Sequence, residues 1–205
     1  MEPYELTYPI DLVFCIDATG SMRHVLDMVK HNATRLHEDI QHAMEKKHRN
    51  ISKMRIRVIA FRDYLTDGDQ AMMASDFFTL PEQTRQFYDC VNGITAQGGG
   101  DIPEDGMEAL AYAIRSDWTR EGIKRRHIIV VWSDAPTHTL GHAKIAPWYP
   151  EGMGLYSVSV LQIRIYGRWS GLRSRYPSFP AASSRMHSAL FALISTCSNI
   201  GSSPQ

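Results

Sequence analysis

The chain alternates short apolar runs with longer stretches of helical periodicity, and this alternation constrains its fold more than any other feature. Residues Leu12–Ile16 form an unbroken apolar run, as long as a strand that is buried on both faces. The stretch after it places Val25, Val29, Leu36 and Ile40 close to one face of a helix. Strand patterns recur at 54–64 and 126–134, separated by helical patterns at 81–94 and 106–117. Strands alternating with helices predict an α/β fold, a three-layer α-β-α arrangement around a mainly parallel sheet.

Composition indicates a globular, cytoplasmic chain. Its 205 residues suit one domain, 43% of them are apolar, and 21% are charged. We expect no membrane association, because no apolar stretch is long enough to span a bilayer and acids occupy the N-terminus where a signal peptide carries bases. Cys15, Cys90 and Cys197 are too scattered for a disulfide framework, which favours the reducing cytoplasm. The 22 basic and 22 acidic residues argue against nucleic acid as a partner.

Acidic and basic residues balance over the whole chain but not within its two parts. Every Asp and Glu lies at or before Glu151, so the first 151 residues carry −5 and the last 54 carry +5. We therefore divide the chain into a domain core, 1–153, and a compositionally anomalous segment, 154–205. That segment either completes the sheet in diverged form, is an out-of-frame ending, or is a basic loop for an acidic partner. Its patterns predict a strand over 156–167 and a helix over 183–196.

Polar residues gather where the predicted strands end. Asp17-Ala18-Thr19-Gly20-Ser21 follows the first strand, and Ser133-Asp134 ends the last one of the core. A loop before a helix supplies Gly98-Gly99-Gly100-Asp101. Ligands of open α/β sheets bind beyond the carboxyl ends of the strands, and hard oxygen ligands suit Mg²⁺. These clusters contain no Cys or His, which disfavours zinc.

This pattern resembles the metal-ion-dependent adhesion site of von Willebrand factor A domains, whose signature is Asp-x-Ser/Thr-x-Ser. The resemblance covers about residues 8–153 and is most similar to intracellular microbial members. It implies that Asp17, Thr19, Ser21, Asp101 and Asp134 surround one Mg²⁺ or Mn²⁺ ion, some through water. Many relatives carry Thr where this chain has Asp101, so we expect a more anionic site and tighter metal binding.

The resemblance implies a metal-dependent protein-interaction module in the cytoplasm, and not an enzyme. Its protein partner would belong to a kinase, phosphatase or ATPase system, as for intracellular relatives. One alternative is a metal-dependent phosphoester hydrolase, although the three loops contain no evident base and no Lys or Arg to clamp phosphate. The other alternative is a metal-free structural scaffold.

Simpler roles remain open for several of these residues. Asp17 and Ser21 could only cap the next helix, and Asp101 could only begin an acid-rich helix start. We expect Asp63 to form a surface salt bridge rather than to approach the metal.

Four residues near these loops also have simple interpretations. We expect Glu104 and Asp105 to be helix-start acids rather than ligands. His138 and His142 have metal-compatible spacing, but Gly141 between them favours a loop without a second metal.

Overall fold

A computed structural model describes residues 7–100, 102–122, 124–150, 165–166 and 190–196 of the chain. Its strands form one mixed sheet in the order β3-β2-β1-β5-β7-β6, with β4 also paired to β2. The strands are β1 (Thr7–Asp17), β2 (Asn50–Phe61), β3 (Met72–Ala74), β4 (Phe78–Leu80), β5 (Arg126–Ser133), β6 (Ile165–Tyr166) and β7 (Leu190–Thr196). The helices are η1 (Gly20–His24), α1 (Leu26–Glu45), α2 (Tyr64–Asp67), η2 (Gly68–Gln70), α3 (Thr84–Asn92) and α4 (Gly106–Ile114).

The three central strands are parallel, and β1 lies between the other two. Ile10 is opposite Met54 of β2 and opposite Arg126 of β5. Strands β3 and β4 pair with β2 in the antiparallel sense, as β7 does with β5. The prediction of an α/β fold around a parallel centre is therefore confirmed, and the antiparallel strands lie outside that centre.

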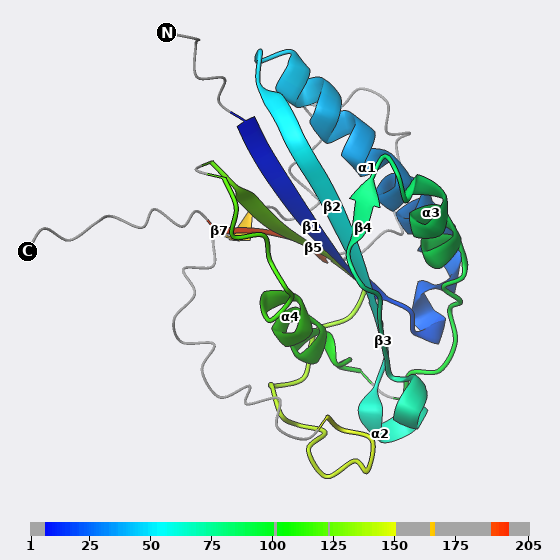
Figure 1. Ribbon diagram of the computed structural model, residues 1–205. Helices are drawn as coiled ribbons and strands as arrows, with labels where there is room; N and C mark the ends of the chain where they lie inside the picture. Colours follow the sequence, from blue (N-terminus) through cyan, green and yellow to red (C-terminus); the bar gives the residue numbers. More distant parts are fainter. Residues whose placement is uncertain (1–6, 101, 123, 151–164, 167–189, 197–205) are drawn as a thin grey trace, which may run out of the picture.

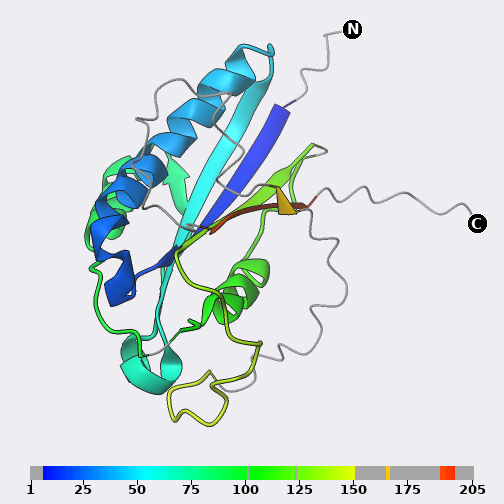
Figure 2. The ribbon, with the colours of Figure 1, turned by 180° about the vertical axis from the view of Figure 1, so that it is seen from behind.

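Successive residues of β1 point into two separate cores. Leu12, Phe14 and Ile16 belong to the core beneath α1 and α3, whereas Val13 and Cys15 belong to the core beneath α4. All five side chains are inaccessible to solvent. A central strand covered on both faces needs apolar residues at every position, which explains the unbroken run in the sequence. Figures 1 and 2 show α1 and α3 on one face of the sheet and α4 on the other.

The segment after residue 153 contributes to the sheet, but not as predicted. Residues 190–196 form strand β7, paired along β5 from Ser133↔Leu190 to His127↔Thr196, so the helix predicted over 183–196 is wrong for these residues. Pairing with the open edge of β5 outweighs the local helical pattern. Of the strand predicted over 156–167, residues 165–166 form β6, and its other residues lie outside the described part of the chain, as do residues 183–189. The boundary at 153 stays a prediction.

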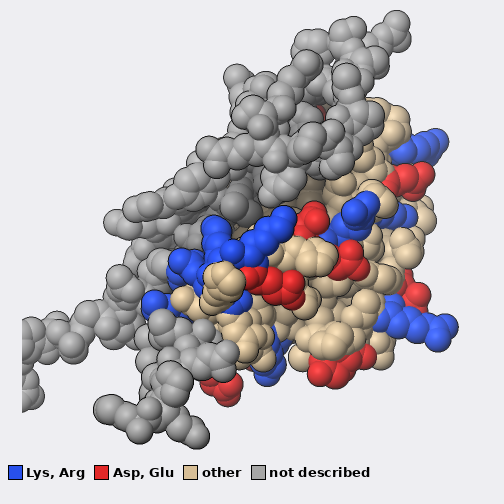
Figure 3. All heavy atoms as spheres, turned by 90° about the horizontal axis from the view of Figure 1, so that it is seen from above, with Lys and Arg blue, Asp and Glu red and all other residues tan. Residues whose placement is uncertain are grey.

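The two ends of the sheet differ in charge. Asp17, Asp63 and Asp134 lie at or near the ends of β1, β2 and β5. Lys and Arg gather at the end where β1 begins, which Figure 3 views directly. None of the described helices has the length and apolar character that crossing a membrane requires.

Candidate metal centre

The ends of β1 and β5 bring the predicted carboxylates and hydroxyls together. Ser133 Oγ donates a hydrogen bond of 2.7 Å to Asp17 Oδ2 across the two strand ends. Asp17 Oδ1 accepts bonds from the Thr19 amide at 3.0 Å and from Thr19 Oγ1 at 2.7 Å. Thr19 Oγ1 lies 3.0 Å from Ser21 Oγ, which donates at 3.0 Å to Asp134 Oδ1. Hydrogen bonds to the two carboxylates and the close approach of the two hydroxyls thus bring four predicted site residues together.

The capping role does not account for Asp17 or Ser21. The residue before η1 is Thr19 and the residue before α1 is Val25, and neither helix has a side-chain hydrogen bond at its cap. The Asp17 carboxylate instead binds within its own loop and across to β5. These two side chains are therefore held at the strand ends by contacts other than helix capping.

The glycine loop lies beside Asp17–Ser21. The amide of Gly20 donates to the carbonyl of Gly98 at 3.0 Å, and the amide of Gly99 donates to Asp67 Oδ2 at 2.9 Å. Gly98 has φ of +69°, and a Cβ there would overlap the Asp67 carboxylate, so glycine is required. Asp101 follows this loop but lies outside the described residues.

The donor set suits a hard divalent cation. Asp17 and Thr19 are almost fully buried, whereas Ser21 is exposed, so the site opens toward solvent on one side. Burial raises the pKa of Asp17, and Asp134 raises it further, against hydrogen bonds from Thr19 and Ser133 that lower it. A cation between the two carboxylates would favour their charged forms and so offset the effects that raise the pKa of Asp17.

The described residues do not by themselves enclose an ion with three acidic, His or Cys side chains. Two carboxylates and two hydroxyls come together, and water and Asp101 would have to complete an octahedral shell. The residues therefore fit Mg²⁺ or Mn²⁺ as a partly hydrated ion.

A group of buried acids beside this site was not expected from the sequence. Asp63, Glu104, Asp105 and Glu108 are each at most 4% exposed, and each has one carboxylate oxygen without a hydrogen-bond partner among the described residues. Burial, and then the charges of Asp17 and neighbouring acids, raise the pKa of Glu104 to about 8. Burial also raises the pKa of Asp105 and of Glu108. Asp105 directly precedes α4, as predicted for a helix-start acid, but its buried carboxylate accepts from the amide of Tyr64 at 2.7 Å and does not cap the helix.

Asp63 is not on the surface either. Its Oδ1 accepts bonds from the amides of Leu65 at 2.6 Å and Thr66 at 3.1 Å, so it caps α2. Its Oδ2 lies 3.7 Å from His138 Nε2, with both side chains buried. The expected surface salt bridge is therefore a buried contact with a histidine.

His138 and His142 stack face to face. Their ring centroids are 4.0 Å apart and their planes differ by 7°. Nitrogen lone pairs lie in the ring planes, so two parallel rings direct them along separate planes rather than at one ion. This geometry agrees with the expectation that the two histidines do not share a metal.

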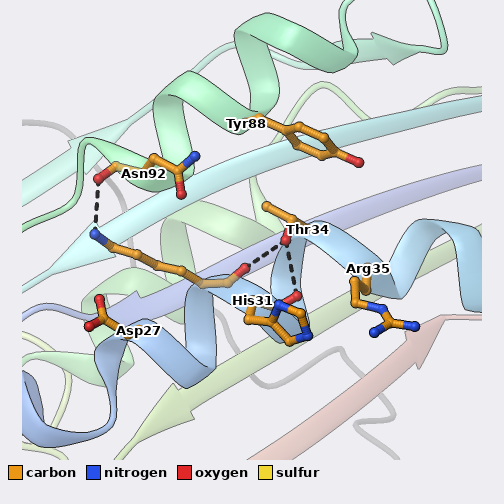
Figure 4. Close-up of a pocket in the computed structure, with 7 residues that line it drawn as sticks. Asp27, His31, Thr34, Arg35, Tyr88 and Asn92 are labelled. Carbon is orange, nitrogen blue, oxygen red and sulfur yellow. Dashed lines mark hydrogen bonds between the residues drawn. The ribbon is translucent and has the colours of Figure 1, made fainter.

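A hollow of about 310 Å³ lies away from this site, between α1 and α3 (Figure 4). Lys30 crosses it and donates from Nζ to the carbonyl of Asn92 at 2.9 Å. Asp27, His31, Arg35 and other polar side chains line it, so this hollow is a shallow polar groove between two surface helices.

Comparison with known proteins agrees with this architecture. Residues 11–138 match the von Willebrand factor A domain family. The chain is 30% identical over 143 residues to the alpha-protein kinase vwkA of Dictyostelium discoideum. This alignment covers 70% of the chain and 21% of that protein. It is 26% identical over 137 residues to a putative ariadne-like RING finger protein, R811, of Acanthamoeba polyphaga mimivirus, covering 66% of the chain and 12% of that protein.

The chain thus spans about a fifth or less of the length of these two relatives. Domains of the matched type generally serve as protein-interaction modules. The family match covers the strands, loops and helices that assemble the candidate site. On this evidence, the chain belongs to the von Willebrand factor A domain family.

Proposed function

We propose that this chain is a metal-dependent protein-interaction module of the cytoplasm. It binds Mg²⁺ or Mn²⁺ through Asp17, Thr19, Ser21, Asp101 and Asp134, and binds a protein partner through the ion. The observation that carries the proposal is the set of hydrogen bonds and close oxygen contacts that runs from Ser133 to Asp134 and gathers hard oxygen donors at one end of the sheet.

The residues of the candidate metal centre have distinct roles in this mechanism. Asp17, held by Ser133 and Thr19, presents a fixed carboxylate, and the exposed Ser21 and the half-buried Asp134 form the open side. A bound ion supplies a positive charge at which a carboxylate from outside can replace water. Partner recognition would thus require an acidic side chain.

The partner is proposed by family resemblance to belong to a kinase, phosphatase or ATPase system. One similar protein is named an alpha-protein kinase and another a RING finger protein, which is compatible with a module joined to regulatory enzymes. The described cysteines, Cys15 and Cys90, are free thiols, as a reducing compartment permits.

Thermal unfolding in EDTA, Mg²⁺ or Mn²⁺ tests the metal site. A ligand at about 100 times its dissociation constant stabilises the folded state by about 2.7 kcal/mol. For a chain of this length that predicts a rise in Tm of about 5–10 °C for the wild type. Asp17→Asn should remove most of the rise, because it removes one of the two described carboxylates.

The matched control is Asp27→Asn, which removes an exposed acid from the first turn of α1 and should keep the full metal response. A folded wild type whose Tm is the same in EDTA and in either metal would refute the proposal and favour a metal-free scaffold.

A phosphoester hydrolase is the weaker alternative. Arg62 is the arginine nearest to the end of β2, but its guanidinium donates to three carbonyls, those of Ala18, Gln70 and Thr95. Those bonds commit it to holding loops together rather than to clamping phosphate. Metal-dependent hydrolysis of a phosphodiester that disappears in Asp17→Asn would favour the enzyme.

A further inference from the structure

Two basic runs, far apart in the sequence, flank the beginning of β1. Residues 46–49 read Lys-Lys-His-Arg and residues 124–126 read Lys-Arg-Arg, so the two runs hold six Lys or Arg and no acid. The first run joins α1 to β2, and the second leads into β5. Neither run contributes to the candidate metal centre, which lies at the opposite end of the same strands.

The sheet register brings the two runs to one end of the molecule. Thr7 of β1 is opposite Asn50, directly after the first run, and Ile10 is opposite Arg126 of the second. Arg49 Cζ lies 5.6 Å and Lys124 Nζ 5.9 Å from the centroid of the same Tyr8 ring. The two runs therefore converge on Tyr8 from either side of β1. We name this surface the basic end; it comprises Lys46, Lys47, Arg49, Lys124, Arg125 and Arg126.

Four charges of the basic end have no acidic partner among the described residues. Lys46, Lys47, Arg49 and Lys124 are exposed, and none takes part in an ion pair between described residues. Like charges held this close repel one another, so the arrangement costs free energy in the isolated domain. Figure 3 shows basic side chains gathered on this face with a few acids among them. The acids nearest to the runs in sequence are Glu45, Asp117 and Glu121.

We infer that the basic end is a second docking surface, independent of the metal centre, for an acidic peptide segment of a protein partner. Two observations favour a peptide over other polyanions. Single-stranded nucleic acid needs open aromatic faces on which bases stack, but Tyr8 is 6% exposed and already covered by two cations. Membrane surfaces also favour apolar anchors, and no large exposed apolar side chain of the described chain belongs to either run.

A flexible segment rich in Asp and Glu suits the exposed lysines of the basic end. Lysine ammonium groups are strongly hydrated point charges that pair with carboxylates without a demanding geometry. The exposed Lys46, Lys47 and Lys124 can each meet a carboxylate along an extended peptide. Binding should weaken as the salt concentration rises, because exposed charges are screened.

Fluorescence anisotropy with a labelled peptide of alternating Glu and Ser tests this surface, with EDTA present so that the metal centre cannot contribute. The double variants Lys47→Gln/Arg49→Gln and Lys124→Gln/Arg125→Gln should each weaken binding about fivefold. The same peptide with Gln in place of Glu should bind far more weakly. Both variants should keep the Tm response to Mg²⁺ that tests the proposed function.

Arg35→Gln/Arg85→Gln is the matched control, because it removes two exposed positive charges on α1 and α3 and leaves both runs intact. Equal losses in the control and in the two variants would overturn the proposal. So would tighter binding of a uridine homopolymer or of phosphatidylserine vesicles than of the Glu peptide, since either result would assign the surface to another class of partner.

Discussion

Glu104→Gln should stabilise the metal-free domain in a strongly pH-dependent way. Glu104 is 4% exposed, and its Oε2 has no hydrogen-bond partner among the described residues. The backbone around it is fixed, because its amide donates to the carbonyl of Pro136 at 3.0 Å and its carbonyl accepts from the amide of His138 at 2.9 Å. These two bonds tie the main chain of Glu104 to the loop after β5. Gln has the same shape and carries no charge.

The expected magnitude follows from the pKa of Glu104, which burial and neighbouring acids raise from 4.5 to about 8 in the folded state. The pKa of Glu104 is higher in the folded state than in the unfolded one. The contribution of the protonated side chain to the free energy of unfolding of the wild type is therefore complete below pH 4.5 and is lost as the pH rises to about 8. At about 1.4 kcal/mol per pH unit, this range gives an upper limit of about 5 kcal/mol. Solvent screening and proton sharing with neighbouring acids reduce it, so we expect about 2–3 kcal/mol.

Urea unfolding in EDTA between pH 5 and pH 8.5 measures the effect. The stability advantage of Glu104→Gln over the wild type should be small at pH 5, grow as the pH rises to about 8 and level off above that. Glu82→Gln is the control, because Glu82 is exposed and its substitution should not alter the pH dependence. An advantage that is constant across this pH range, or a loss of stability at pH 8, would refute the assignment of a buried carboxylate that destabilises the fold when charged.

Three further substitutions test the packing around the site. Gly98→Ala should lower the free energy of unfolding and the Mg²⁺ affinity together, because its Cβ would displace the Asp67 carboxylate from the glycine loop; titration calorimetry and urea unfolding measure the two effects. Ser133→Ala should cost about 1.5–3 kcal/mol in urea unfolding, because the buried Asp17 loses a charge-assisted bond of 2.7 Å; an unchanged midpoint would contradict this. Asp11→Ala should cost about 1–3 kcal/mol in urea unfolding, because the half-buried Arg55 guanidinium loses its carboxylate partner at 2.7 Å and the Thr119 amide loses its acceptor; a loss below about 0.5 kcal/mol would contradict this.

The centre of the fold could be predicted from the sequence because burial alone sets the pattern of apolar residues there. Each residue of Leu12–Ile16 enters a core, so every position is apolar, and the strand could be recognised without tertiary information. Strand β7 could not be recognised in this way. Its residues are ordinary helix formers in part, and only the unpaired edge of β5 favours the extended form.

The candidate site was predictable for the residues that follow strand ends. Asp17, Thr19, Ser21 and Asp134 meet because parallel strands finish at one edge of a sheet. The burial of Glu108 was not predictable, because it depends on the loop after β5: the Gly141 amide donates at 2.7 Å to Glu108 Oε1, and Tyr149 hydroxyl lies 3.3 Å from the same oxygen. Only the spacing of Glu108 on an otherwise apolar helix, GMEALAYAI, could have signalled an inward-facing acid.

The central position of β1 has a consequence for how the chain reaches its native state during synthesis. β1 is synthesised before the two strands that flank it. Its residue Ile10 pairs with Met54 and with Arg126, which follow it in the sequence by 44 and 116 residues, so both edges of β1 are paired only after β5 has been made. A nascent chain that ends before β5 therefore exposes one edge and much of both faces of its most apolar strand. Such intermediates fold slowly and aggregate readily, so the ribosome-bound chain should depend on chaperones until β5 has emerged.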